Sequence, residues 1–219
     1  MKIVLYTDDP FWQAVSPQQA LIGLNRARGR ELGLIYAACS LANQGHNVAV
    51  FTPCTVEQEF QGVMWRNSSK FIHNLNQDED TYDVLMAWSW PHILGEPGVK
   101  DKFKLKIAAE VTMDFFIGDT EQFIDAHFCL SQFHARTLQK FDDAIDPNKI
   151  MVCPTIGVYL KDFEKRKDTP KSEKKFVWIS SPDRGLWHVL RVWPRILQHY
   201  GDDCTLDIYY NFDESFEST

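Results

Sequence analysis

Residues 31–51 read ELGLIYAACSLANQGHNVAVF, and this stretch decides the fold. Apolar side chains recur through residues 31–44 at the spacing of one face of a helix. Gly45 follows in the position of a glycine that ends a helix, and residues 47–52 then form an apolar run typical of a buried strand. A similar run, residues 2–7, precedes the helix. Strand, helix and strand in this order predict a βαβ unit, whose two strands lie parallel in one sheet.

The alternation of strands and helices continues to residue 160. Ser131 is placed to cap a helix over residues 132–142. Further short apolar runs predict strands at residues 62–66, 82–88, 103–110, 126–130 and 149–153. The sequence therefore predicts an α/β fold with a Rossmann-like, doubly wound parallel sheet for a first domain, residues 1–160.

A second, shorter α/β unit follows a charged linker. Residues 161–175 are rich in Lys and Arg with interleaved acids and few apolar side chains, which is typical of an exposed linker. A strand over 175–180, a helix over 186–200 and a strand over 205–210 then form another βαβ unit. One such unit is too small to bury both faces of its sheet. Residues 176–219 are therefore predicted to be an incomplete second Rossmann-like unit.

The composition is that of a globular protein and argues against several functional classes. The 219 residues are 44% hydrophobic and 24% charged, with a formal net charge of −7. Most of that charge lies in residues 202–219, which hold six acidic residues and no Lys or Arg, so we expect no nucleic-acid partner. No apolar run approaches the ~18 residues that span a bilayer, so no transmembrane segment is expected.

The cysteines and histidines predict no metal site. The five cysteines form no C-x-x-C pair, and the seven histidines show no i, i+4 pair, so neither a zinc site nor a redox motif is signalled. Reduced thiols and a start that is too quickly polar for a signal peptide favour a cytoplasmic location.

Two loops are placed where open α/β sheets bind ligands, after a strand and before a helix. Residues 180–186 (SSPDRGL) combine a helix start that attracts phosphate with the cation of Arg184 and with Gly185, which allows close backbone approach. The alternative is an ordinary surface turn. Residues 29–33 (GRELG) precede the first helix, where the helix dipole favours Glu31 whether or not it binds a ligand.

Two further patterns allow both a functional and a structural interpretation. Asp78-Glu79-Asp80 has the D-x-D spacing that suits a divalent cation, but it precedes a strand, and an acidic loop is the alternative. Trp88 and Trp90 follow a strand, where their rings could stack on a sugar or a base or pack in the core.

Four segments, taken in order, resemble one family. Residues 31–51 are similar to the opening helix and strand of GT-B glycosyltransferases of the family 4 kind, which typically end L-A-x-x-G-H-x-V-x-V-F. Residues 130–138 (LSQFHARTL) resemble that family's S-x-F-x-x-x-x-L segment, and residues 149–158 (KIMVCPTIGV) resemble the stretch before its interdomain crossing. Residues 176–186 resemble the start of its nucleotide-sugar domain. The matches keep the family's order along nearly the whole chain.

The resemblance implies a glycosyltransferase of the hexosyltransferase type that transfers a sugar from a nucleoside-diphosphate sugar to a carbohydrate or glycosylated acceptor. It implies no metal and no cofactor beyond that donor substrate. Gly29 and Glu31 would face the acceptor side of the cleft, and Asp114 is the candidate catalytic base. The residues that would bind the donor diphosphate are Ser180, Ser181, Arg184 and Gly185.

The sequence also departs from the family, which leaves a second interpretation open. The paired glycine before the first helix is Gly29-Arg30 here, and no Lys follows Arg184 four or five residues later. The family's acidic nucleotide- and sugar-binding motif would lie beyond residue 219. The alternative function is a non-catalytic, degenerate Rossmann-like module that binds carbohydrate or a partner protein. Either way, self-association or a partner chain is expected to cover the incomplete second unit.

Overall fold

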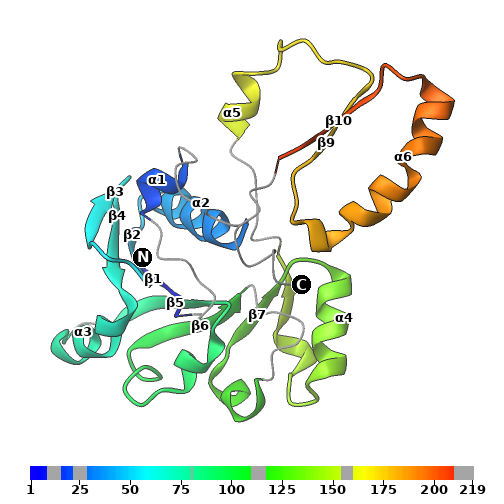
Figure 1. Ribbon diagram of the computed structural model, residues 1–219. Helices are drawn as coiled ribbons and strands as arrows, with labels where there is room; N and C mark the ends of the chain where they lie inside the picture. Colours follow the sequence, from blue (N-terminus) through cyan, green and yellow to red (C-terminus); the bar gives the residue numbers. More distant parts are fainter. Residues whose placement is uncertain (9–15, 22–28, 80, 110–116, 154–159, 210–219) are drawn as a thin grey trace. The chain divides into compact units, whose positions relative to one another are not determined.

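The computed structural model describes residues 1–8, 16–21, 29–79, 81–109, 117–153 and 160–209. Contacts between Cα atoms divide the chain into two compact units, Met1–Tyr159 and Leu160–Thr219. Figure 1 labels the helices and strands of both.

The first unit is built on a sheet of eight strands in the order β3-β4-β2-β1-β5-β6-β7-β8. Every neighbouring pair is parallel except β3 and β4. The strands are β1 (Lys2–Tyr6), β2 (Asn47–Thr52), β3 (Gln58–Phe60), β4 (Val63–Asn67), β5 (Tyr82–Trp88), β6 (Phe103–Ala109), β7 (Ala126–Cys129) and β8 (Ile150–Val152). This mostly parallel sheet confirms the predicted Rossmann-like α/β class.

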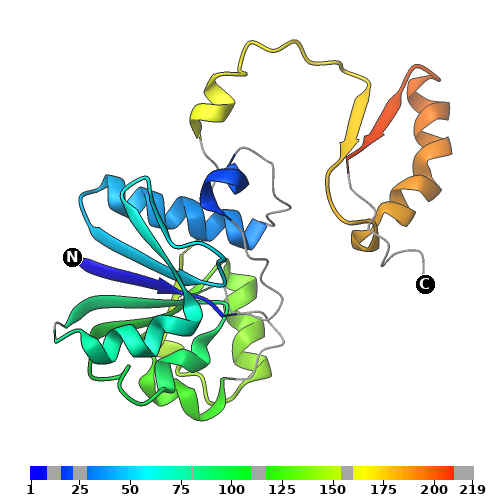
Figure 2. The ribbon, with the colours of Figure 1, turned by 60° about the vertical axis from the view of Figure 1, so that its left-hand side comes forward.

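Helices cover both faces of this sheet, as a doubly wound fold requires (Figures 1 and 2). On one face α2 packs its buried side chains against Ile3 and Leu5 of β1, and on the other face α3 and α4 pack near Val4 and Tyr6. All four of these β1 side chains are buried, which explains why the strand reads as a continuous apolar run. The α-helices of the unit are α1 (Pro17–Leu21), α2 (Gly29–Asn43), α3 (Phe71–Gln77) and α4 (Gln132–Phe141).

The local signals in the sequence act as predicted at two helix ends. The Ser131 side chain accepts a hydrogen bond from the His134 N–H at 3.1 Å and so caps α4. Gly45 has a φ of +85° directly after α2. Among the described residues of the unit, the 3-10 turns are η1 (Ser68–Lys70), η2 (Pro91–Gly95), η3 (Gly118–Phe123) and η4 (Pro147–Lys149).

The second unit holds two parallel strands and one long helix among its described residues. Its elements are α5 (Leu160–Glu164), β9 (Lys175–Trp178), η5 (Pro182–Arg184), α6 (Leu186–Tyr200) and β10 (Thr205–Ile208). The rings of Phe176 and Trp193 pack edge to face at 5.5 Å and join β9 to α6. On the other face of β9, Val177 is 57% exposed. The short helix α5 lies at the start of the stretch expected as a linker, and residues 163–175 are exposed.

Candidate functional site

The carboxyl ends of the parallel strands form the part of the first unit where a ligand site is expected. From β1 the chain continues to β2 and β4 on one side, and later returns to β5 on the other side of β1. Strand order therefore reverses between β1 and β5. In open α/β sheets the crevice at such a reversal, outside the carboxyl ends of the strands, is the usual ligand site.

Three polar residues lie in a row at this reversal. Because β1 lies between β2 and β5 in matched register, Thr52, Thr7 and Trp88 come side by side where the three strands end. Side chains alternate along each strand, so all three lie on the face that α2 covers. We refer to Thr7, Thr52 and Trp88 as the edge row.

Each member of the edge row buries a polar atom that has no hydrogen-bond partner among the described residues. These atoms are Oγ1 of Thr7, Oγ1 of Thr52 and Nε1 of Trp88. Thr7 and Trp88 are fully buried, and Thr52 is only 3% exposed. An unsatisfied buried donor or acceptor costs about 1–3 kcal/mol, so polar groups of this kind mark places where a water or a ligand is held.

The first turn of α2 supplies the two residues that the resemblance assigns to the acceptor side. Gly29 is the first residue of α2, and a Cβ placed on it would meet no other atom within 4 Å. Glu31 lies in the same turn and is 1% exposed. Since α2 covers the face that holds the edge row and begins at the carboxyl edge, its first turn lies at the same end of the sheet.

Ser89, directly after β5, has an unusual backbone conformation. Its φ is +60°, in the left-handed region that residues other than glycine rarely adopt. The side chain is buried, and the Ser89 N–H donates to the carbonyl oxygen of Ala109 at 2.8 Å, so the conformation is fixed by the neighbouring strand. Backbone strain of this kind gathers at functional sites. Nothing in the sequence of this segment signalled it.

A second polar contact joins two strand ends on the same edge. The Ser68 hydroxyl at the start of η1 donates to Oδ1 of Asp8, directly after β1, at 2.8 Å. Asn67 caps η1 and also donates from Nδ2 to the carbonyl oxygen of Cys54 at 2.6 Å. These contacts connect Asp8, after β1, and Cys54, after β2, to the residues where β4 ends and η1 begins.

Trp88, the last residue of β5, and Trp90 have different surroundings. Trp88 is fully buried and packs under α2, so its ring is part of the core. Trp90 is half-buried against the opposite core cluster, and its ring meets that of His92 edge to face at 5.8 Å. The Trp88 ring is therefore unavailable for stacking on a ligand, and its buried indole N–H has no hydrogen-bond partner among the described residues.

In the second unit, the predicted diphosphate loop connects β9 to α6. Ser180 and Ser181 are half-buried, Arg184 is exposed, and the Arg184 N–H donates to the carbonyl oxygen of Ser181 at 3.0 Å. Gly185 has a φ of +110° and is the N-cap residue directly before α6. The four residues predicted to bind a diphosphate therefore lie within one six-residue turn, residues 180–185, that leads into α6.

Trp178, the last residue of β9, lies behind this turn. Its Cη2 atom is 3.9 Å from the position of a Cβ on Gly185, and its buried Nε1 has no hydrogen-bond partner among the described residues. Glycine is needed here chiefly for its backbone conformation, because a side chain at φ +110° would be strained.

The remaining predicted residues do not join either group. Asp114 lies outside the described residues. Asp78 follows α3 and precedes β5, at the amino edge of the sheet, where its Oδ2 accepts a hydrogen bond from the Tyr82 hydroxyl at 2.5 Å. Among the described residues, no three His, Cys, Asp or Glu side chains gather as metal ligands would. Asp80 of the D-x-D spacing is outside the described residues.

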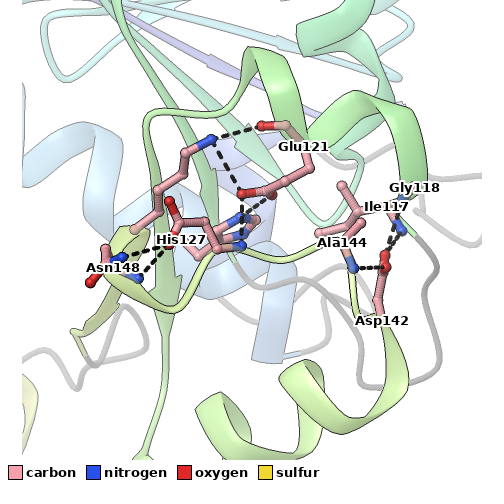
Figure 3. Close-up of polar contacts among 9 residues, drawn as sticks. Ile117, Gly118, Glu121, His127, Asp142, Ala144 and Asn148 are labelled. Atoms are coloured by element: carbon pink, nitrogen blue, oxygen red, sulfur yellow. Dashed lines mark hydrogen bonds and ion pairs between the residues drawn. The ribbon is translucent and has the colours of Figure 1, made fainter.

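A buried polar network that the sequence did not reveal lies at the amino edge (Figure 3). Glu121 on η3 accepts from three groups: His127 Nε2 lies 2.6 Å from its Oε2, the Asp146 N–H lies 3.2 Å from its Oε1, and Lys149 Nζ lies 3.3 Å from the same oxygen. His127 is 1% exposed. Burial lowers the pKa of His127 below its ordinary value, against the opposing effect of Glu121, so the imidazole is neutral near pH 7.

Asp142, just after α4, holds a second group of hydrogen bonds near this network (Figure 3). Its Oδ2 accepts from the N–H groups of Ile117 at 2.7 Å and Gly118 at 3.0 Å, and its Oδ1 accepts from the Ala144 N–H at 3.0 Å. Burial alone would raise the pKa of this carboxyl, but the three donors together lower it. Because the network joins backbone segments far from the carboxyl edge, its function is structural.

The buried thiols of Cys39 and Cys129 are not suited to act as nucleophiles. Burial raises the pKa of both the Cys39 and the Cys129 thiol to about 11, so each stays protonated at neutral pH. The Tyr6 phenol at the end of β1 also has a raised pKa, through burial and the nearby carboxylates of Asp8 and Glu96. Among these groups, none is activated for covalent chemistry.

Comparison with known proteins assigns no family. No protein-family model matches the chain, and a search of curated proteins gives no significant match. Among the described residues, no helix is long and apolar enough to cross a membrane. The functional argument therefore depends on the fold, the edge row and the loop at residues 180–186.

Proposed function

We propose that the chain is a GT-B glycosyltransferase, or one part of such an enzyme, that transfers a sugar from a nucleoside-diphosphate sugar to an acceptor without a metal. One observation carries the proposal: two α/β units follow one another in the chain, and each has polar groups at the carboxyl end of its strands. That arrangement suits a donor held by one unit and an acceptor held by the other.

The loop at residues 180–186 supports the donor side of the proposal. A diphosphate leaving group gains negative charge in the transition state, and an Arg beside a helix start stabilises such charge. Arg184 is exposed one residue before Gly185, the residue that precedes the first turn of α6. Ser180 and Ser181 add hydroxyl groups on the strand side of the turn.

The edge row supports the acceptor side. Thr hydroxyls and an indole N–H form hydrogen bonds with the hydroxyl groups of a sugar, and Glu31 at the start of α2 is an acceptor of the kind that sugar hydroxyls need. Asp114 stays the proposed general base.

A thermal-shift panel of nucleoside diphosphates and nucleotide sugars tests the donor site. We expect at least one donor to raise Tm in wild type and in Arg195→Ala, and not in Arg184→Ala. Arg195 is the matched control, because it is an exposed Arg on the same helix, two turns from the loop. A shift kept in Arg184→Ala, or lost equally in both variants, would contradict the proposed diphosphate site.

A second function, carbohydrate binding without catalysis, is favoured by one observation. The edge row and the first turn of α2 lie entirely in the first unit, so this unit has polar groups for a sugar independently of the second. Glycan-array binding that needs no nucleotide, together with no sugar transfer from any donor in the panel, would favour this function. Donor-dependent transfer abolished by EDTA would instead contradict metal independence and return attention to Asp78.

A further inference from the structure

The outward face of α4 carries the exposed aromatic rings of the first unit. Phe133 is 64% exposed and Phe141 is 51% exposed, whereas the other aromatic side chains described in residues 1–153 are buried or half-buried. The two rings are about 12 Å apart along the helix axis, as the rise of an α-helix over eight residues requires. Large aromatic groups held in water on a rigid helix indicate a surface that meets a partner.

These rings are not needed to pack α4 onto the sheet. The inner face of the helix is fixed by Ala135 and Leu138, which are buried in the core cluster on this side of the sheet. The Ser131 cap fixes the start of the helix. The outward face is therefore held in position by other residues, and its composition is free to serve a different purpose.

The same face is positively charged. Arg136 and Lys140 are exposed and share the outward face with Phe133 and Phe141, at helix positions i, i+3, i+7 and i+8. No acidic residue occurs in α4, and neither cation forms an ion pair with a described residue. The net charge of the chain is −7, whereas this face of α4 carries two cations beside two exposed rings.

Apolar groups continue from the helix onto the neighbouring edge strand. On β8, which contacts α4, Val152 is 41% exposed and lies on the same face of the sheet as α4, because it pairs with Cys129 of the core cluster on that face. The edge of the sheet and the helix beside it thus present one apolar margin next to the cations. We call Phe133, Arg136, Lys140 and Phe141, with Val152, the α4 surface.

We propose that the α4 surface docks the protein on an anionic lipid bilayer. Aromatic rings insert at the boundary between headgroups and acyl chains, while Arg and Lys attract anionic headgroups. The outward side of a helix is convex. Lipids in a fluid bilayer can rearrange around such a surface, so no preformed pockets are needed for the two rings. An acidic protein would match the cations but would need apolar pockets spaced for the two rings, so the bilayer is the better fit.

Vesicle co-sedimentation tests the proposal with the full chain. The probes are vesicles of phosphatidylcholine alone and of phosphatidylcholine with phosphatidylglycerol. We expect wild type to bind the anionic vesicles and to bind the neutral ones much more weakly, with binding reduced by salt. Arg136→Gln/Lys140→Gln should lower the partition coefficient about 25-fold, from about fivefold per cation. Phe133→Gln/Phe141→Gln should lower it about tenfold or more.

Matched controls separate docking from unrelated effects of the substitutions. Val56→Gln removes an apolar side chain that is 67% exposed on another loop, and Lys100→Gln removes an exposed cation elsewhere. Both should bind vesicles like wild type. Circular-dichroism melts of every variant show whether the fold is retained, and glutamine is used because it favours helix.

Three outcomes would overturn the proposal. Wild type could fail to bind anionic vesicles. The α4 variants could bind as well as the controls. Finally, soluble polyglutamate could bind wild type as tightly as vesicles do, with no loss in Phe133→Gln/Phe141→Gln, which would identify an acidic macromolecule as the partner of this surface.

Discussion

Replacing Thr7 by valine tests whether the edge row is unsatisfied in the free protein. The change turns a hydroxyl into a methyl of nearly the same size and keeps the β-branched shape that suits a strand. The Thr7 side chain is fully buried, and its Oγ1 has no partner among the described residues. Desolvation of such a hydroxyl costs about 1–3 kcal/mol, and valine removes that cost. We expect the free energy of unfolding to rise by about 1–2 kcal/mol.

Urea unfolding followed by tryptophan fluorescence measures this gain, and a thermal melt should show Tm rising by about 2–4 °C per kcal/mol. Thr137→Val is the matched control, because the Thr137 hydroxyl donates to the carbonyl oxygen of Phe133 at 2.9 Å. The same atoms are exchanged there, but a made hydrogen bond is lost, so no gain is expected. Thr52→Val should behave like Thr7→Val, since both hydroxyls belong to the edge row.

A loss of stability in Thr7→Val by about 1 kcal/mol or more would refute the reasoning, because it would mean that water already satisfies the hydroxyl in solution. A gain in stability joined to a weaker thermal shift with a bound sugar would instead show the trade-off expected of a binding site. Groups kept ready for a ligand lower the stability of the free protein.

Three other predictions concern the polar network and the two glycines. Burial lowers the pKa of His127, so the stability that its neutral form contributes is complete above about pH 6.5 and is lost as pH falls below that value. The difference in Tm between about pH 7.5 and about pH 5.5 should therefore be smaller in His127→Gln than in wild type. It should be unchanged in the control His199→Gln, because His199 is exposed. Asp142→Asn weakens three hydrogen bonds to a carboxylate and should cost about 2–3 kcal/mol in urea unfolding; because the pKa of Asp142 is lowered, its contribution is lost only as pH falls below about 4. Gly185→Ala should lower the stability of the second unit by about 1 kcal/mol or more, because alanine is strained at a positive φ. Gly29→Ala should not lower the stability of the first unit, because Gly29 has open space around it and no positive φ. Hydrogen exchange measured separately for each unit checks both expectations.

The parts of the fold that could be predicted from the sequence are those set by local chemistry. The helix over residues 186–200 was predicted at the residues where α6 lies, because its apolar spacing is regular and Gly185 marks its start. The strands at residues 2–7 and 47–52 were recognised because burial on both faces leaves an unbroken apolar run. The edge strand β3 was missed, since Gln58-Glu59-Phe60 is short, mostly polar and recognisable only through its pairing with β4.

The site could be predicted less completely, because its members come together only through strand register. Nothing near Thr7 in the sequence connects it to Thr52 or Trp88, and only the pairing of β1 with β2 and β5 sets them side by side. The loop at residues 180–186 is different: strand, turn and helix are consecutive there, so spacing alone was enough to single it out. Contiguous sites can be read from a sequence, whereas sites assembled across a sheet need the topology.

The two edges of the first sheet differ in a way that bears on function. At the amino edge, charged side chains are paired: Asp83 binds Lys104 at 2.7 Å and accepts from the Lys2 N–H at 2.8 Å, and Glu121 holds His127 and Lys149. At the carboxyl edge, the edge row keeps three buried polar atoms without partners among the described residues. At the amino edge one such atom, Nδ1 of the buried His127, is also without a partner among the described residues. A fold under selection for stability alone would satisfy or remove such groups. The three atoms of the edge row lie where the strand order reverses, and a ligand bound there would supply the missing hydrogen bonds and so stabilise the protein.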